Sequence, residues 1–133
     1  MGKKRKYTPP TFETMHPEGR HVYMAIYDTL YTSPAWKELT DKQVRLYIFC
    51  RWQYWTKREN RPGADYPDYE PYQAPEVFYL NWRKVRSAGV YKENKGRFYA
   101  DVKALCERGL IECLYNGKSG RRKSVFRLSD LWH

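Results

Sequence analysis

The side chains best suited to catalysis or metal binding are scattered along this chain of 133 residues. His16, His21 and His133 lie near the chain ends, and no His-x-Glu, Cys-x-x-Cys or glycine-rich phosphate-loop pattern occurs. Cys106 and Cys113 are seven positions apart but have no histidine nearby in sequence to complete a zinc site. We therefore expect no enzyme activity, no cofactor, no metal and no small-molecule substrate.

Cationic side chains are the other group that could do chemistry, and their distribution is uneven. The formal net charge is +10. Residues 1–6 contribute +4, residues 7–80 contribute −2, residues 81–127 contribute +9 from 13 basic and 4 acidic side chains, and residues 128–133 contribute −1. A surface that is solvated evenly would not concentrate charge in this way. The pattern is typical of a surface that faces a polyanion.

Composition also sets the expected compartment. No run of apolar residues is long enough to cross a membrane, and the basic run Lys3–Lys6 is not followed by the apolar segment of a secretory signal. Cys50, Cys106 and Cys113 are odd in number and lie in apolar segments, which is typical of reduced core thiols. We expect a cytoplasmic, nucleoid-associated protein with no membrane partner.

The chain divides into a tail and one domain. Residues 1–20 are basic, contain proline and show no periodicity, which predicts a flexible basic arm. Residues 21–133 are expected to form a single domain, interrupted at 58–75 by a loop rich in tyrosine and proline. This loop could pack on the domain itself, on a second copy in a homodimer, or on another protein.

Local signals place the first helices. Residues 21–32 fit either a short extended piece or a helical turn. Ser33 followed by Pro34 predicts a short helix, because serine is a good N-cap and proline suits the first helical position. Thr40 and Gln43 have the spacing of a capping box, which predicts a central helix over residues 41–57. The apolar spacing assigns its buried face to Val44, Tyr47, Ile48, Arg51, Trp52 and Trp55, widened by Leu46, Phe49, Cys50 and Tyr54.

The remaining elements follow in a definite order. The sequence predicts a short strand at 76–80, a helix at 82–88 capped by Asn81, a helix at 94–108 stopped by Gly109, and strands at 110–115 and 123–128. Between the last two strands lies a turn-rich basic loop at 116–122. The expected fold class is α+β: a winged helix-turn-helix, mostly helical, with a small β-hairpin wing and an extra short strand.

This arrangement predicts a duplex DNA interface. In a winged helix-turn-helix the second helix of the motif enters the major groove and the wing lies along the backbone. Cations at the wing tip would contact phosphate, Arg97 would suit phosphate or guanine, and Asn94 would suit adenine. The predicted DNA-binding residues are Arg83, Lys84, Lys92, Asn94, Lys95, Arg97, Lys103, Lys118, Arg121, Arg122 and Lys123, with Arg86 as a further backbone contact and Tyr99 at the border of the apolar face.

Three stretches resemble winged-helix proteins of gram-positive mobile elements, including the N-terminal domains of plasmid replication initiators. They are Ser-Pro-Ala-Trp-Lys-Glu-Leu at 33–39 with the Val-Arg-Leu-Tyr helix after it, the segment from Arg-Phe-Tyr-Ala at 97–100 to Gly-Leu-Ile at 109–111, and Phe-Arg-Leu-Ser-Asp-Leu-Trp at 126–132. The resemblance covers about residues 28–132. It implies sequence-specific or general DNA binding, in transcription regulation or in replication of a mobile element.

Two alternatives remain open from the residues alone. A winged helix also serves as a protein-interaction scaffold, which the tyrosines at 58–75 would suit. A basic surface with aromatic rings also binds RNA, because unpaired bases stack on rings. The basic hairpin tip has only Tyr115 beside it, so duplex DNA is favoured over RNA.

Overall fold

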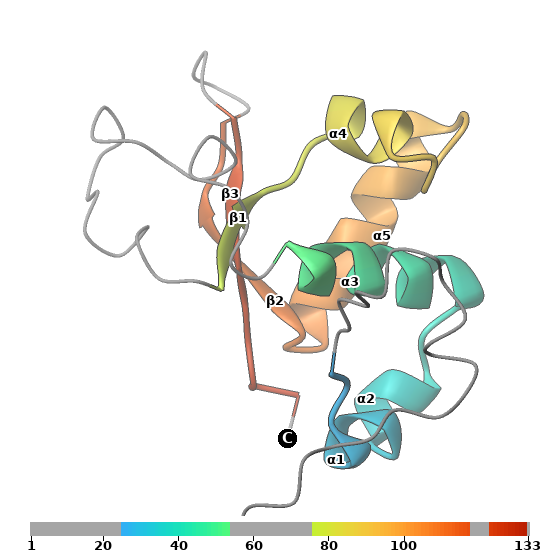
Figure 1. Ribbon diagram of the computed structural model, residues 1–133, viewed down its shortest axis with the longest axis vertical. Helices are drawn as coiled ribbons and strands as arrows, with labels where there is room; N and C mark the ends of the chain where they lie inside the picture. The colour runs from blue at the N-terminus through green and yellow to red at the C-terminus, as the bar shows by residue number, and fades with distance from the viewer. Residues whose placement is uncertain (1–24, 54–75, 118–122, 133) are drawn as a thin grey trace, which may run out of the picture.

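The computed structural model describes residues 25–53, 76–117 and 123–132. These ranges hold five helices and a three-stranded antiparallel sheet, which confirms the predicted α+β class (Figure 1). The predicted arm at 1–20 and loop at 58–75 lie outside the described residues. The elements are α1 (Asp28–Tyr31), α2 (Pro34–Lys37), α3 (Asp41–Trp52), β1 (Val77–Tyr79), α4 (Trp82–Ser87), α5 (Lys95–Glu107), β2 (Ile111–Tyr115) and β3 (Val125–Leu128).

The helix starts confirm the capping signals in the sequence. The Ser33 side chain accepts a hydrogen bond from the Trp36 amide at 3.2 Å and caps α2. At α3, the Gln43 amide donates to Thr40 Oγ1, while the Gln43 side chain accepts from the Thr40 amide. Each bond satisfies an amide that has no partner inside its helix. The ambiguous stretch at 21–32 contributes the single helical turn of α1.

The central helix α3 differs from its prediction in length and in the face it buries. It ends at Trp52 with Gln53 as its C-cap, so the predicted extension to residue 57 was wrong. Ile48 and Trp52, both assigned to the buried face, are 37% and 64% exposed. Leu46, Tyr47, Phe49 and Cys50 are buried as predicted, and Gln53 is buried although the sequence did not single it out. The side-chain NH₂ of the buried Gln53 donates to the Tyr79 carbonyl at 3.5 Å.

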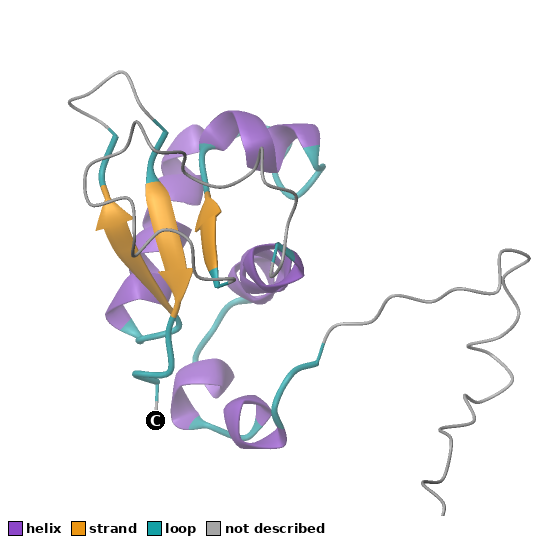
Figure 2. Cartoon of the chain, turned by 60° about the vertical axis from the view of Figure 1, so that its left-hand side comes forward, coloured by secondary structure: helices purple, strands orange, loops and turns teal. Residues whose placement is uncertain are grey.

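The sheet joins residues that are distant in the chain. Its strand order is β1-β3-β2, so β3 lies in the middle and pairs antiparallel with both neighbours (Figure 2). Val77 faces Arg127 across one pair, and Ile111 faces Leu128 across the other. β2 and β3 form the hairpin that the sequence predicted. β1 is the extra short strand.

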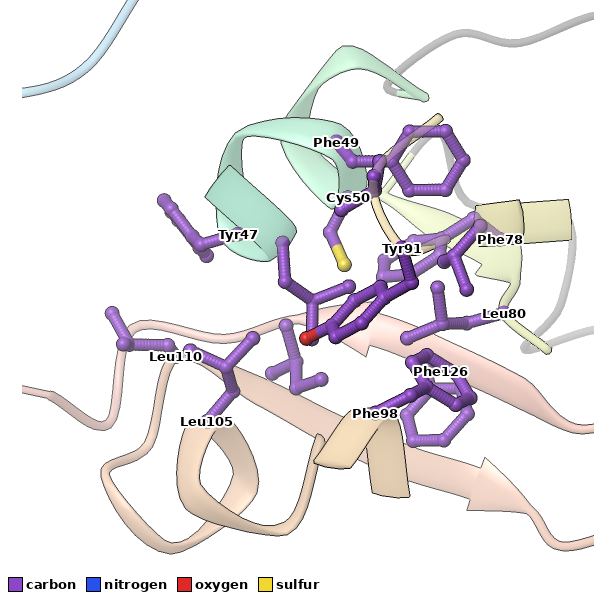
Figure 3. Close-up of a cluster of buried hydrophobic side chains, with 14 of the residues drawn as sticks. Tyr47, Phe49, Cys50, Phe78, Leu80, Tyr91, Phe98, Leu105, Leu110 and Phe126 are labelled. Atoms are coloured by element: carbon purple, nitrogen blue, oxygen red, sulfur yellow. The ribbon is translucent and has the colours of Figure 1, made fainter. Parts of the chain in front are cut away.

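Aromatic and aliphatic side chains from the helices and the sheet form one main core. Figure 3 shows Tyr91 and Phe98 beside Leu105 and Phe126, with Cys50 and Phe49 above them. The Tyr91 and Phe98 rings meet edge to face with centroids 5.5 Å apart. Burying a large apolar side chain contributes about 1.5–3 kcal/mol, so this core fixes α5 against α3 and the sheet. The position of α5 is therefore set by packing along its inner side.

The three cysteines do not all lie in the core, which corrects the prediction. All three are free, and Cys50 is fully buried. Burial raises the pKa of the Cys50 thiol. Cys106 is half-buried, with a pKa raised by burial to about 11, and Cys113 is exposed on β2. Strand alternation does not explain this exposure, because Cys113 is two positions from the buried Ile111 and lies opposite Phe126 in the sheet.

Candidate nucleic-acid interface

The first turn of α5 is organised by Asn94. This residue has φ +68°, in the left-handed region that asparagine tolerates better than most residues. Its side-chain oxygen accepts a hydrogen bond from the Arg97 amide at 3.0 Å, so Asn94 caps the helix. The sequence assigned Asn94 to adenine recognition. The structure gives its oxygen a capping role and leaves only the side-chain NH₂ for a ligand.

The exposed face of α5 carries two lysines and a tyrosine. Lys95, Tyr99 and Lys103 all lie on the side that faces away from the core. Tyr99 is 55% exposed, and the Lys95 ammonium lies 5.8 Å from the centre of its ring. Lys103 pairs with Glu107 at 3.8 Å across an exposed i,i+4 spacing, which stabilises the helix only weakly. These cations remain accessible to a polyanion.

Arg97 lies on the side of α5 that faces α3. Its Nε donates to Oδ1 of Asp101 at 3.3 Å. Asp101 is 1% exposed, and its carboxylate also accepts hydrogen bonds from the Tyr91 hydroxyl at 2.6 Å and from the side-chain NH₂ of Gln43 at 3.1 Å. Burial and this hydrogen bond raise the pKa of Tyr91. Asp101 thus links α3, α5 and the turn before α5, and it holds one edge of a guanidinium that is half exposed.

The predicted residues of α4 and the α4–α5 turn are divided between solvent and interior. Arg83, Arg86 and Lys92 are exposed. Lys84 instead turns its ammonium toward the Tyr79 carbonyl at 3.3 Å. Burial, together with the nearby Lys123 charge, lowers the pKa of Lys84 to about 8. Of these four cations, Lys84 is therefore the least suited to a phosphate contact.

Of the predicted DNA-binding cations of the hairpin, Lys123 lies within the described residues. The Lys123 ammonium lies 5.0 Å from the centre of the Tyr79 ring, next to the start of β3. The predicted wing-tip residues Lys118, Arg121 and Arg122 lie outside the described residues. At the hairpin turn, the Gly117 amide donates to the Ser124 hydroxyl at 2.9 Å.

Two cations on α3 join this surface although the sequence did not single them out. Lys42 donates to the Val90 carbonyl at 2.9 Å, and its ammonium lies 5.1 Å from the centre of the Tyr91 ring. Arg45 donates to the Gly89 carbonyl at 3.2 Å. Both lie on the side of α3 that faces the α4–α5 turn. Their spacing of three positions along a helix is the sequence signal that could have marked them.

These side chains surround a hollow of about 450 Å³, here called the cationic hollow. It lies between the N-terminal half of α3, the α4–α5 turn and the first turn of α5. Its lining consists of Lys42, Arg45, Gly89, Val90, Tyr91, Lys92, Glu93, Asn94 and Arg97. Four cationic side chains therefore face one carboxylate.

A second hollow of about 470 Å³ lies between α1, the second half of α3 and the C-terminal segment, and is called the C-terminal hollow. Arg127 pairs there with Glu112, and Arg51 donates to the Ala25 carbonyl at 2.9 Å. Its lining consists of Tyr27, Leu30, Tyr47, Arg51, Glu76, Glu112, Arg127, Leu128, Ser129, Asp130, Leu131 and Trp132. Two cations thus face three carboxylates.

Neither metal chemistry nor a known relative adds to this geometry. In residues 25–53, 76–117 and 123–132, no group of three or more His, Cys, Asp or Glu side chains is placed to hold a metal ion. None of the helices in those ranges is both long and apolar enough to traverse a bilayer. Comparison with protein-family models, curated proteins and solved structures found no match to this chain.

Proposed function

We propose that this protein is a winged-helix module that binds duplex DNA, with α5 as its recognition helix. The order helix, strand, helix, helix and hairpin in α3–β3 supports this topology. So does the sheet order β1-β3-β2, in which the first strand extends the hairpin. In this reading α4 and α5 form the helix-turn-helix pair, and the β2–β3 hairpin is the wing.

The observation that carries the proposal is the exposed face of α5. Lys95, Tyr99 and Lys103 project from the side that does not pack on the core, along a helix of 13 residues. A major groove about 12 Å wide admits such a helix, and lysine suits both phosphate and guanine. The core packs against the inner side of this helix and fixes the position of its cations. Such cations attract the phosphates of a duplex more strongly than they attract an uncharged partner.

The biological setting is proposed from the resemblance to mobile-element winged-helix proteins. Their role implies transcription regulation or replication as the output. The net charge of +9 over residues 81–127 supports a nucleic-acid partner for the same segment that contains α4, α5 and the hairpin. The hairpin cations that follow Gly117 would add contacts to the DNA backbone.

The test compares two charge reversals that alter net charge equally. Lys103→Glu places a carboxylate on the exposed face of α5, and Lys37→Glu does the same on α2. Binding to a labelled duplex of mixed sequence is measured by fluorescence anisotropy across a salt series. We expect Lys103→Glu to weaken binding about tenfold or more, because it replaces attraction by repulsion inside the interface. Lys37→Glu should change affinity by less than about threefold, since only screened long-range charge is altered.

Three outcomes would contradict the proposal. Equal loss in both variants would mean that net charge alone drives association. A wild-type affinity that does not fall with added salt would exclude phosphate contacts as the source of binding. Single-stranded RNA that displaces the duplex at lower concentration than unlabelled duplex would favour the RNA-binding alternative.

A further inference from the structure

Hydrogen bonds to the backbone hold cations of the cationic hollow in place. Lys42 and Arg45 each reach from α3 to a backbone carbonyl of the α4–α5 turn, 48 and 44 positions away in sequence. Carbonyl groups are neutral acceptors, so these bonds orient the two cations without cancelling their charge. An ammonium has three donors and a guanidinium has five, so both retain donors for a ligand after these bonds form.

A third cation is positioned from the opposite wall. Arg97 uses its Nε on the buried Asp101 carboxylate, which leaves the two terminal amino groups of the guanidinium on the far side. This side chain is half exposed. Because Asp101 is also held by Tyr91 and Gln43, it cannot follow Arg97 toward solvent. The planar fork of Arg97 is thus presented at the hollow in a fixed orientation, which favours two-point donation to an oxyanion.

The balance of charge in the hollow favours an anion that accepts several hydrogen bonds. Four cations face Glu93 alone in the lining, and positive charge in a concave site concentrates potential. The volume of about 450 Å³ greatly exceeds the ~30 Å³ that a water molecule occupies in the liquid. A tetrahedral oxyanion would therefore enter with part of its hydration shell, within reach of donors on three sides.

We infer that the cationic hollow binds a phosphate of the DNA backbone beside the groove that α5 occupies; this inference rests on the proposed function. Asn94 and Arg97 in the lining of the hollow are the N-cap and a first-turn residue of α5, so the hollow adjoins the N-terminal end of this helix. A helix lying in the major groove is flanked by the two phosphate backbones. The turn and the start of α3 lie on one flank of α5, and the strands lie on the other (Figure 1).

The inference is tested with Arg45→Gln, which removes one charge but keeps a side-chain donor for the Gly89 carbonyl. Lys37→Gln removes the same charge from α2, and Arg45→Lys restores the cation. Duplex affinity is measured by anisotropy at several salt concentrations. We expect Arg45→Gln to weaken binding about threefold to tenfold and to reduce the salt slope by about 0.9, which corresponds to one lost phosphate contact. Lys37→Gln should leave the slope unchanged, and Arg45→Lys should recover it.

The outcomes separate this inference from the proposed function. If Arg45→Gln keeps the wild-type slope while Lys103→Glu weakens binding, the hollow does not hold a phosphate but α5 still binds DNA. If polyglutamate displaces the duplex from the wild-type protein, and Arg45→Gln removes that competition without changing the duplex slope, the hollow binds carboxylates and the inference is overturned. If no variant responds to salt, the proposed function fails as well.

Discussion

The two hollows of this molecule have nearly the same volume, about 450 and 470 Å³, but opposite charge. The cationic hollow has four basic side chains and one acidic side chain in its lining, whereas the C-terminal hollow has two and three. They also lie in different parts of the fold. The lining of the first includes the α4–α5 turn, while that of the second includes residues of α1 and of the C-terminal segment. Figure 1 shows the α4–α5 turn far from α1 and the C-terminal end.

The two hollows also differ in the groups that their cations contact. Arg127 pairs with Glu112 in the C-terminal hollow, so a carboxylate offsets its charge. In the cationic hollow Arg97 likewise pairs with the buried Asp101, but Lys42 and Arg45 bind carbonyl groups, which do not offset their charge. In the C-terminal hollow Arg51 is the cation bound to a carbonyl. Volume therefore does not distinguish the two hollows. The cationic hollow therefore has more positive charge that no carboxylate in its lining offsets.

The largest effect is expected from the glycine that supports the C-terminal hollow. Gly109 has φ +76°, and a Cβ there would lie 2.6 Å from the Leu131 carbonyl carbon. Gly89, in the lining of the cationic hollow, has φ +77° but no atom near an added Cβ. Gly89→Ala should cost about 1–2 kcal/mol for the left-handed backbone. Gly109→Ala should cost about 2 kcal/mol more, because the C-terminal backbone must move.

Urea denaturation of the two alanine variants measures this difference directly, since the backbone penalty is shared. Equal destabilisation would mean that the C-terminal segment moves away without cost. Duplex binding by the folded fraction of Gly109→Ala should match wild type. Loss of that binding would mean that the two hollows are not independent.

A smaller effect, on the pH dependence of stability, is expected from Lys84. It tests whether a lysine ammonium that is bound to a carbonyl keeps its charge when it is also buried. Lys84 has a pKa lowered from 10.5 to about 8 by burial, so the unfolded chain holds this proton where the folded chain releases it. Stability should therefore rise with pH between about 8 and 10.5, because the unfolded state binds more protons there. Lys84→Met removes this contribution.

The measurement is the difference in unfolding free energy between Lys84→Met and wild type at several pH values. The stability of Lys84→Met relative to wild type should be greatest near pH 7. This difference in unfolding free energy should shrink above pH 8, where the wild-type ammonium has lost its proton. Lys103→Met, on the exposed face of α5, reports the effect of removing any lysine. A Lys84→Met difference that does not vary with pH would show that the ammonium is not penalised by its surroundings.

Elements of this fold could be predicted where a few neighbouring residues determine them. Ser33 with Pro34, Thr40 with Gln43, and Asn81 all cap helices as their spacing indicates, because each bond spans only three residues. The strands and the turn before α5 follow from similarly local patterns.

The buried side of α3 could be predicted only in part, since Leu46, Tyr47, Phe49 and Cys50 are buried as their spacing indicates but other positions differ. Apolar spacing assigned Ile48 and Trp52 to the interior, but contacts with β1 bury Gln53 instead. The cationic hollow was missed for the same reason, since Lys42 and Arg45 meet carbonyls that are far away in sequence. Periodicity indicates which residues share a face of a helix, but contacts with distant parts of the chain decide which of them are buried.

The smallest effect is expected in the C-terminal hollow itself. Glu112→Gln leaves Arg127 without its ion-pair partner, although both side chains are about 40% exposed. Exposed ion pairs contribute about 0–1 kcal/mol, so thermal unfolding should change little. Duplex affinity should stay within about twofold, because this hollow lies away from α5. A tenfold gain in affinity would mean that the carboxylate normally repels the duplex at that site. The charge contrast between the hollows would then separate two parts of one interface rather than a binding surface from the rest of the molecule.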